Sequence, residues 1–292
     1  MRRSLVCVLT GAVLAASMIG TVCLADEAKT FTVGFDAEYP PFGYMDEDGE
    51  YTGFDLELAQ AVCDLQGWEL VKTPIDWDSK DMELNSGAID CIWNGFTMNG
   101  REDDYTWSVP YVDNSQVIVI PEDSDIADLA GLAGKTVGVQ AASAALELLS
   151  DGGDQADLAA TFGTLQQFPD YNNAFIELQA GSIDAIAMDI GVANYQLKQH
   201  EGYKILDEAL NSEKYAVGFK LGNEELRDTV NDSLMQLKED GTFDALAEKY
   251  ELTDMVCLGE DGDAEAATEA ATEAATEGAS EAAAETEAET EA

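Results

Sequence analysis

One arginine of this acidic chain stands in a setting that suits a small carboxylate. Arg101 follows a short apolar run and Thr97, within the stretch G-F-T-M-N-G-R-E-D-D-Y-T-W-S-V-P-Y over residues 95–111. A guanidinium is planar and can give two parallel charge-assisted hydrogen bonds to one carboxylate. The alternative is a surface arginine paired with Glu102 or Asp103. The hydroxyl and the turning backbone beside Arg101 favour the anion-binding interpretation.

Two further stretches accompany this arginine. G-F-D-L-E-L-A-Q-A-V-C-D-L precedes it at residues 53–65, and D-A-I-A-M-D follows at residues 184–189. In that order the three resemble the polar amino-acid-binding proteins of bacterial ABC importers, solute-binding protein family 3, over about residues 31–250. The resemblance implies an α/β, two-lobed type II periplasmic-binding-protein (Venus-flytrap) fold. It also implies two hinge strands and a ligand held in the interlobe cleft.

The resemblance assigns roles to residues that would hold the backbone groups of an amino acid. Arg101 would bind the α-carboxylate, and Asp189 would receive the α-ammonium, in addition to the N-cap role that an aspartate at a helix start often has. Gly95 and Thr97 stand where the family uses a backbone carbonyl and a hydroxyl for the same two groups. The spacing from Thr97 to Arg101 is four residues where the family usually has five, so we expect a reshaped loop.

Other positions match the walls of the family's ligand pocket. The segment Q-A-A-S-A at residues 140–144 replaces a Gly/Thr-rich turn at a helix start, where backbone N–H groups favour an anion and Ser143 can add its hydroxyl. Tyr39 and Trp77 match aromatic side chains that enclose the ligand side chain, although both could be core residues. Asp36 would face a distal donor of the ligand. The weaker candidates for the same pocket are Asn94 and Gln140.

The elements that must position these residues alternate between strand and helix. Residues 31–35 read as a strand, and residues 36–42 as a rigid loop with two prolines. Helical periodicity covers residues 54–65 and stops at Gly67. Strands at 70–73 and 88–93 enclose a helix around 80–85, and Asp48-Gly49 suits a hairpin turn. This alternation predicts a mostly parallel sheet.

A second α/β unit follows, bounded by two extended connectors. Its expected elements are strands at 116–120, 135–139 and 183–188 and helices at 128–133, 143–149 and 172–180. The connectors lie at about 113–117 and 213–217 and, by the resemblance, are hinge strands. After them, Asn223 can cap a helix with an apolar stripe, which Gly241 interrupts. We therefore expect one lobe from residues 31–114 and 215–258, and the other from residues 115–214.

The two ends of the chain have their own compositions. Met1-Arg2-Arg3 and an apolar run over about 5–24 predict a signal peptide over residues 1–25. Cleavage after Ala25 would release a secreted protein, whereas cleavage before Cys23 would leave a lipid-anchored one. Either way the protein is expected outside the cytoplasm, in the periplasm or at the cell surface. Residues 259–292 hold Ala, Glu and Thr almost alone, which predicts a disordered acidic tail.

The composition of the chain argues against several classes of function. A formal net charge of −45 argues against nucleic acid and anionic membranes as partners. With His200 as the one histidine and no nucleophile motif, the sequence indicates no catalytic residue, and it suggests no metal or cofactor. Cys63, Cys91 and Cys257 could be buried thiols or could include one disulfide. The expected partners are an L-amino acid and the transmembrane subunits of an ABC permease, with the protein itself a monomer.

Two other functions remain open on the same fold. The first is a small-acid dehydratase, for which Glu38 or Asp36 could be nominated as the acid or base. The second is a module that senses its ligand for a receptor. Recovery of the ligand unchanged would exclude the first, and the genes that neighbour this one would distinguish the second.

Overall fold

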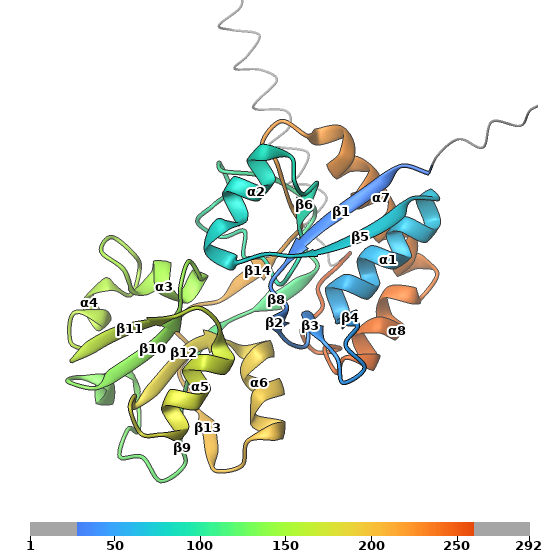
Figure 1. Ribbon diagram of the computed structural model, residues 1–292. Helices are drawn as coiled ribbons and strands as arrows, with labels where there is room; N and C mark the ends of the chain where they lie inside the picture. The colour runs from blue at the N-terminus through green and yellow to red at the C-terminus, as the bar shows by residue number, and fades with distance from the viewer. Residues whose placement is uncertain (1–27, 260–292) are drawn as a thin grey trace, which may run out of the picture.

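The chain forms two α/β lobes with a short two-stranded sheet between them (Figure 1). The structure, a computed structural model, describes residues 28–259. The expected signal peptide and all but the first residue of the expected acidic tail lie outside the described residues. The sheet between the lobes pairs β8 (Val112–Asn114) with antiparallel β14 (Glu213–Tyr215), so both expected connectors run side by side.

The first lobe is built on a five-stranded mixed sheet that helices cover. Its strand order is β5-β1-β6-β15-β7, that is Glu69–Pro74, Thr30–Phe35, Cys91–Ile92, Gly218–Phe219 and Thr106–Trp107. Its helices are α1 (Phe54–Gln66), α2 (Lys80–Ser86), α7 (Glu224–Glu239) and α8 (Thr242–Lys249). The expected apolar stripe of α7 is confirmed: Leu226, Val230, Leu234 and Leu237 are all buried.

The second lobe repeats this plan. Its strand order is β11-β10-β12-β9-β13, that is Thr164–Phe168, Thr136–Gln140, Ala185–Asp189, Gln116–Pro121 and Tyr203–Ile205. Its helices are α3 (Ala144–Leu149), α4 (Ala156–Ala159), α5 (Tyr171–Gln179) and α6 (Ile190–Gln199). All five residues of β12 are buried, which explains why this strand reads as a continuous apolar run.

The expectation of mostly parallel sheets is only partly right. In each lobe four strands run in one direction, but β15 runs antiparallel to both of its neighbours, β6 and β7, and β9 runs antiparallel to both β12 and β13. These two strands enter their sheets directly from the hinge, without the crossover helix that a parallel neighbour requires. The hinge connections therefore set their direction.

Short elements complete the lobes. A small antiparallel sheet consists of β2 (Glu38–Tyr39), β3 (Gly43–Met45) and β4 (Tyr51–Thr52). The expected hairpin turn joins β3 to β4, with Gly49 at φ 83°. The described residues also form the 3-10 helices η1 (Trp77–Ser79) and η2 (Leu129–Leu132). The second replaces the helix expected at 128–133, with the Asp128 carboxylate accepting from the Gly131 N–H at 3.0 Å.

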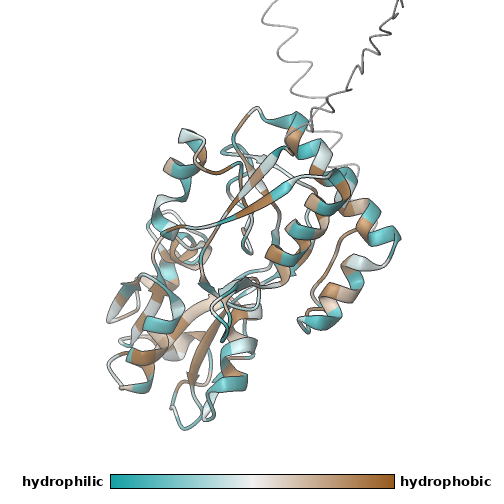
Figure 2. Cartoon of the chain, turned by 45° about the vertical axis from the view of Figure 1, so that its right-hand side comes forward, coloured by the Kyte–Doolittle hydropathy of each residue, from teal (hydrophilic) through white to brown (hydrophobic). Residues whose placement is uncertain are grey.

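An apolar core continues from one lobe into the other. Hydrophobic residues follow the strands in the interior, while the helices turn hydrophilic faces outward (Figure 2). Across the cleft, the rings of Tyr39 and Tyr171 lie 6.0 Å apart, centroid to centroid. Cys63 and Cys91 are buried and are not disulfide-bonded. No helix among residues 28–259 has the length and apolar character that crossing a membrane requires.

Candidate functional site

The loop after β6 holds Arg101 in a buried position. Its backbone N–H donates to the Met98 carbonyl at 3.0 Å, and the indole N–H of Trp107 donates to the Arg101 carbonyl at 3.0 Å. The guanidinium lies 5.2 Å from the ring centroid of Phe96, and its Nη1 donates to the Thr97 carbonyl at 3.2 Å. Only 6% of Arg101 is exposed. The shortened loop therefore still buries the arginine against an aromatic wall.

The ion partner of Arg101 comes from the opposite lobe. Arg101 Nε donates to the two carboxylate oxygens of Glu147 at 3.2 and 3.0 Å, and Nη2 donates to Oε1 at 2.7 Å. Glu147 lies on α3 of the second lobe, whereas Arg101 lies between β6 and β7, two strands of the first lobe's sheet. Arg101 is therefore paired across the cleft with Glu147. The alternative considered from the sequence was an ion pair with one of its chain neighbours, Glu102 or Asp103.

Asp189 ends β12 at the N-cap position of α6, yet its side chain makes no capping bond. Instead Oδ1 accepts hydrogen bonds from Tyr215 at 2.6 Å, from Asn114 at 2.8 Å and from Gln116 at 2.6 Å. The hydroxyl of Tyr171 lies 3.4 Å from Oδ2. The carboxylate is therefore turned into the cleft rather than back along its own helix.

A second carboxylate, Glu213, is buried beside Asp189. Asn114 Nδ2 and Gln116 Nε2 each bridge the two, donating to Glu213 Oε1 at 2.8 and 2.7 Å. The Thr97 hydroxyl also donates to Glu213, at 2.8 Å, so Thr97 reaches this carboxylate. Burial, and after it the charge of Glu213, raises the pKa of Asp189. A cation placed against Asp189 would relieve both effects.

Eight of the ten ligand-binding residues expected from the sequence line one small cavity of about 10 Å³. They are Tyr39, Trp77, Gly95, Thr97, Arg101, Gln140, Ser143 and Asp189. That space is about the size of one water molecule. A ligand larger than water can occupy this space only if the walls of the cavity move apart.

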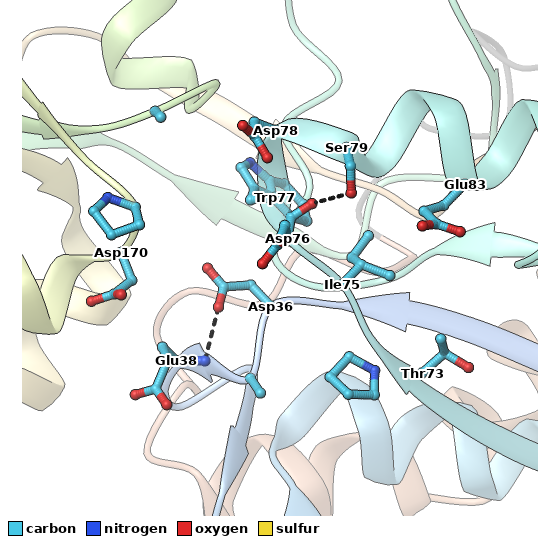
Figure 3. Close-up of a pocket in the computed structure, with 14 residues that line it drawn as sticks. Asp36, Glu38, Thr73, Ile75, Asp76, Trp77, Asp78, Ser79, Glu83 and Asp170 are labelled. Carbon is cyan, nitrogen blue, oxygen red and sulfur yellow. Dashed lines mark hydrogen bonds between the residues drawn. The ribbon is translucent and has the colours of Figure 1, made fainter.

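Asp36 lines a larger cavity of about 700 Å³ that shares Trp77 with the small one. Its carboxylate accepts hydrogen bonds from Gln140 Nε2 of the other lobe at 2.6 Å and from the Glu38 N–H at 2.8 Å. Burial raises the pKa of Asp36 to about 6. Figure 3 shows Asp170 on one side of this cavity, with the other labelled carboxylates on the opposite side. The lining carboxylates are Asp36, Glu38, Asp76, Asp78, Glu83 and Asp170.

Two expected residues have other surroundings than the resemblance implied. Asn94 is fully buried and lines neither cavity; a Cβ added at Gly43 would lie 2.2 Å from its Oδ1. Ser143 caps α3, accepting from the Leu146 N–H at 3.1 Å and donating to the Gln140 carbonyl at 2.8 Å. The turn before it places Ala142 at φ 54°, the conformation that glycine adopts most easily.

Gly95 lies where a side chain would not fit. Its φ is 55°, and an added Cβ would lie 2.9 Å from the Tyr215 ring and 3.0 Å from the Tyr39 ring. Its N–H donates to the buried Asp55 carboxylate at 2.5 Å, and burial raises the pKa of that carboxyl to about 7. The G-F-D-L motif thus places Asp55 beneath the cavity wall.

Sequence reasoning missed the residues around Asp189. These are Asn114, Gln116, Tyr171, Glu213 and Tyr215, and four of the five lie on the hinge strands or directly beside them. The sequence did contain a signal for these residues, namely polar side chains within the two extended connectors. A polar side chain that is buried in a strand needs a hydrogen-bond partner nearby, so such residues are expected to group together.

Comparison with known proteins identifies the family. The model of bacterial extracellular solute-binding proteins, family 3, matches residues 31–253. The chain belongs to this family. The L-cystine-binding protein TcyJ of Escherichia coli K12 is 30% identical, over 77% of this chain and 83% of TcyJ.

Solved structures agree with the family assignment and with the type II periplasmic-binding-protein fold. An ABC uptake transporter substrate-binding protein from Streptococcus pneumoniae with bound histidine has a TM-score of 0.72 and 32% identity, over 76% of this chain and 92% of that one. The ancestral amino acid-binding protein AncCDT-1, a precursor of cyclohexadienyl dehydratase, has a TM-score of 0.69 and 30% identity, over 76% and 95%.

Proposed function

We propose that this chain is an extracytoplasmic solute-binding protein that captures one polar or basic L-amino acid for uptake by an ABC transporter. The observation that supports this most is the cavity lined by Arg101 from one lobe and Asp189 from the other. An α-carboxylate and an α-ammonium are the groups that such a pair of opposite charges would hold. The permease's transmembrane subunits would receive the ligand.

Capture would proceed by closure of the two lobes around the ligand. The paired strands β8 and β14 join the lobes, and hinged closure is a motion known for two-lobed binding proteins. Closure brings Gln140 onto Asp36 and removes water from Arg101 and Asp189. Because charges attract more strongly where water is excluded, the closed form would hold the ligand's charged groups. The ligand would leave chemically unchanged.

The acidic cavity beside the site favours a ligand side chain with a distal hydrogen-bond donor. Asp36 already accepts hydrogen bonds from Gln140 and from the Glu38 N–H, but no lysine or arginine of the described chain lines its cavity. A donor on the ligand side chain would add a hydrogen bond to the remaining lone pairs of this carboxylate, and a cationic donor would also supply the missing opposite charge. Arginine, lysine, histidine and glutamine all carry a suitable donor. The carboxylates around the larger cavity favour the cations, whereas Gln140 suits a neutral polar group.

Acidification should weaken the binding of a basic amino acid. With its pKa raised to about 6, Asp36 is ionised at pH 7.5 and about nine-tenths protonated at pH 5. A cationic side chain must then displace a proton, so Kd should rise about tenfold between these pH values. The raised pKa of Asp189 acts in the same direction. Calorimetry from pH 7.5 to 5 would measure the change, and Asp36→Asn should remove part of it.

Loss of folding would not explain such a weakening. A carboxyl group whose pKa is higher in the folded than in the unfolded chain adds stability as the pH falls through its folded pKa. Asp36 therefore stabilises the unliganded fold between about pH 6 and pH 4 relative to pH 7. An affinity for arginine that stayed constant or increased on acidification would contradict the proposed contact with Asp36.

A thermal-shift screen over the twenty L-amino acids tests the proposed function. A ligand that binds only the folded state at a hundred times its Kd adds about 2.7 kcal/mol of stability. We expect a large shift with one or a few polar or basic amino acids. No shift with any amino acid would reject the function, and tight exclusive binding of leucine, aspartate or glutamate would reject the ligand class.

A small-acid dehydratase is the second candidate, because AncCDT-1, itself an amino acid-binding protein, is a precursor of cyclohexadienyl dehydratase. It would need an acid or base at the ligand. Asp36 is held by Gln140, and Glu38 is exposed and accepts a hydrogen bond from Asn172. Incubation with the bound amino acid, followed by mass spectrometry, should return it unchanged. A ligand-sensing module would bind the same way and would be distinguished by a receptor gene beside this one.

A further inference from the structure

The ion pair between Arg101 and Glu147 joins the two lobes at the binding site. Arg101 lies in the first lobe with 7% of its side chain exposed, and Glu147 projects from α3 of the second with 54% exposed. Both Glu147 oxygens contact the same edge of the guanidinium, formed by Nε and Nη2. Such two-point contacts fix the plane of a guanidinium as well as its charge.

The ion pair with Glu147 uses only some of the hydrogen-bond donors of the Arg101 guanidinium. A guanidinium has five N–H groups: one on Nε and two on each Nη. Glu147 takes the Nε N–H and one on Nη2, and the Thr97 carbonyl takes one on Nη1. One N–H remains on each Nη nitrogen. Arg101 and Asp189 line the small cavity, whereas Glu147 does not. A ligand carboxylate in that cavity would therefore meet Arg101 at a different place from the carboxylate of Glu147.

We propose that Glu147 is a positioning residue that fixes Arg101 from across the cleft, so that the remaining Nη edge meets the carboxylate of the ligand. The inference rests on the proposed function. Because the two residues lie on opposite lobes, their ion pair forms only when the lobes close. Glu147 therefore orders the guanidinium and stabilises the closed complex in one contact.

This arrangement predicts a kinetic signature. Association occurs through the open form, in which Arg101 and Glu147 are apart, so its rate should not depend on Glu147. Release requires the ion pair to break. Replacing Glu147 by alanine should therefore speed release and raise Kd by about 3- to 10-fold, as for a partly exposed but two-point ion pair.

The test measures association and release rates by stopped-flow fluorescence, with the amino acid that gives the largest thermal shift as the probe. Glu147→Ala should release faster with an unchanged association rate, and Glu147→Gln should lie between it and the unmodified protein. Asp125→Asn is the matched control, since it removes a carboxylate of the same lobe whose partner, Lys135, lies in that lobe too. Its rates should equal those of the unmodified protein.

Salt separates positioning from a merely structural role. Raising the salt concentration should speed release from the unmodified protein toward the rate of Glu147→Ala, because screening weakens a partly exposed ion pair. The variant's own release rate should respond less. Equal release rates would overturn the proposal, and tighter binding by Glu147→Ala would show instead that Glu147 competes with the ligand. An unmodified protein that binds no amino acid would reject the proposed function itself.

Discussion

Replacing Arg101 by alanine should weaken the binding of every amino acid that the protein accepts by roughly 200- to 5000-fold. The ligand carboxylate loses its water when the lobes close, and only a matched cation can replace that hydration. Removing one partner of a buried charge pair costs about 3–5 kcal/mol, which corresponds to that range. Glu147 would also lose its partner, but with half of its side chain exposed it can be hydrated again.

Calorimetry on the purified variant measures this loss. Lys238→Ala is a suitable control, because Lys238 also belongs to the first lobe and pairs with a carboxylate, Asp244, and neither residue lines either cavity. The control should bind like the unmodified protein. If Arg101→Ala bound within about threefold of the unmodified protein, a difference under 1 kcal/mol, the carboxylate would not be held there.

Replacing Asp189 by asparagine should weaken the same ligands by roughly 30- to 1000-fold, or about 2–4 kcal/mol, without changing which side chain is preferred. The ligand's ammonium would face a neutral amide in place of a buried carboxylate. The unliganded variant, however, should be at least as stable as the unmodified protein at pH 7. Burial and Glu213 both oppose ionisation of Asp189, and asparagine removes that cost.

Differential scanning fluorimetry with and without ligand separates the two effects. The melting temperature of Asp189→Asn should be unchanged or higher without ligand, while the shift caused by ligand becomes much smaller. A lower melting temperature together with unchanged affinity would mean that Asp189 serves the fold rather than the ligand.

The local parts of this account could be predicted from the sequence. The α7 stripe and the end of α1 at Gly67 follow from periodicity and from a glycine in left-handed conformation, and both are found as expected. Strands β11 and β13 were missed. Both lie at sheet edges with mostly exposed or half-buried residues, so neither shows an apolar pattern.

Long-range partners could not be predicted. Asn114 meets Asp189 and Glu213 across 75 and 99 residues of sequence, and Glu147 meets Arg101 across 46. The two contacts of Asn114 depend on how β8 pairs with β14 and how β9 pairs with β12, and the contact of Glu147 depends on how the lobes close. No local pattern in the sequence records either. Asn94 shows the same limit of a local pattern: it adjoins Gly95 in sequence, but its side chain is buried next to Gly43 and lines neither cavity.

The most direct measurement removes the two proposed anchoring groups from the ligand instead of from the protein. The amino acid identified by the thermal screen is titrated calorimetrically beside its decarboxylated amine and its N-acetyl derivative. With Arg101 and Asp189 as the two anchors, each derivative should bind at least about 100-fold more weakly than the parent amino acid, a loss of about 2.7 kcal/mol or more. If either derivative bound as tightly as the parent, the corresponding anchor, and with it the proposed capture of an amino acid between the lobes, would be wrong.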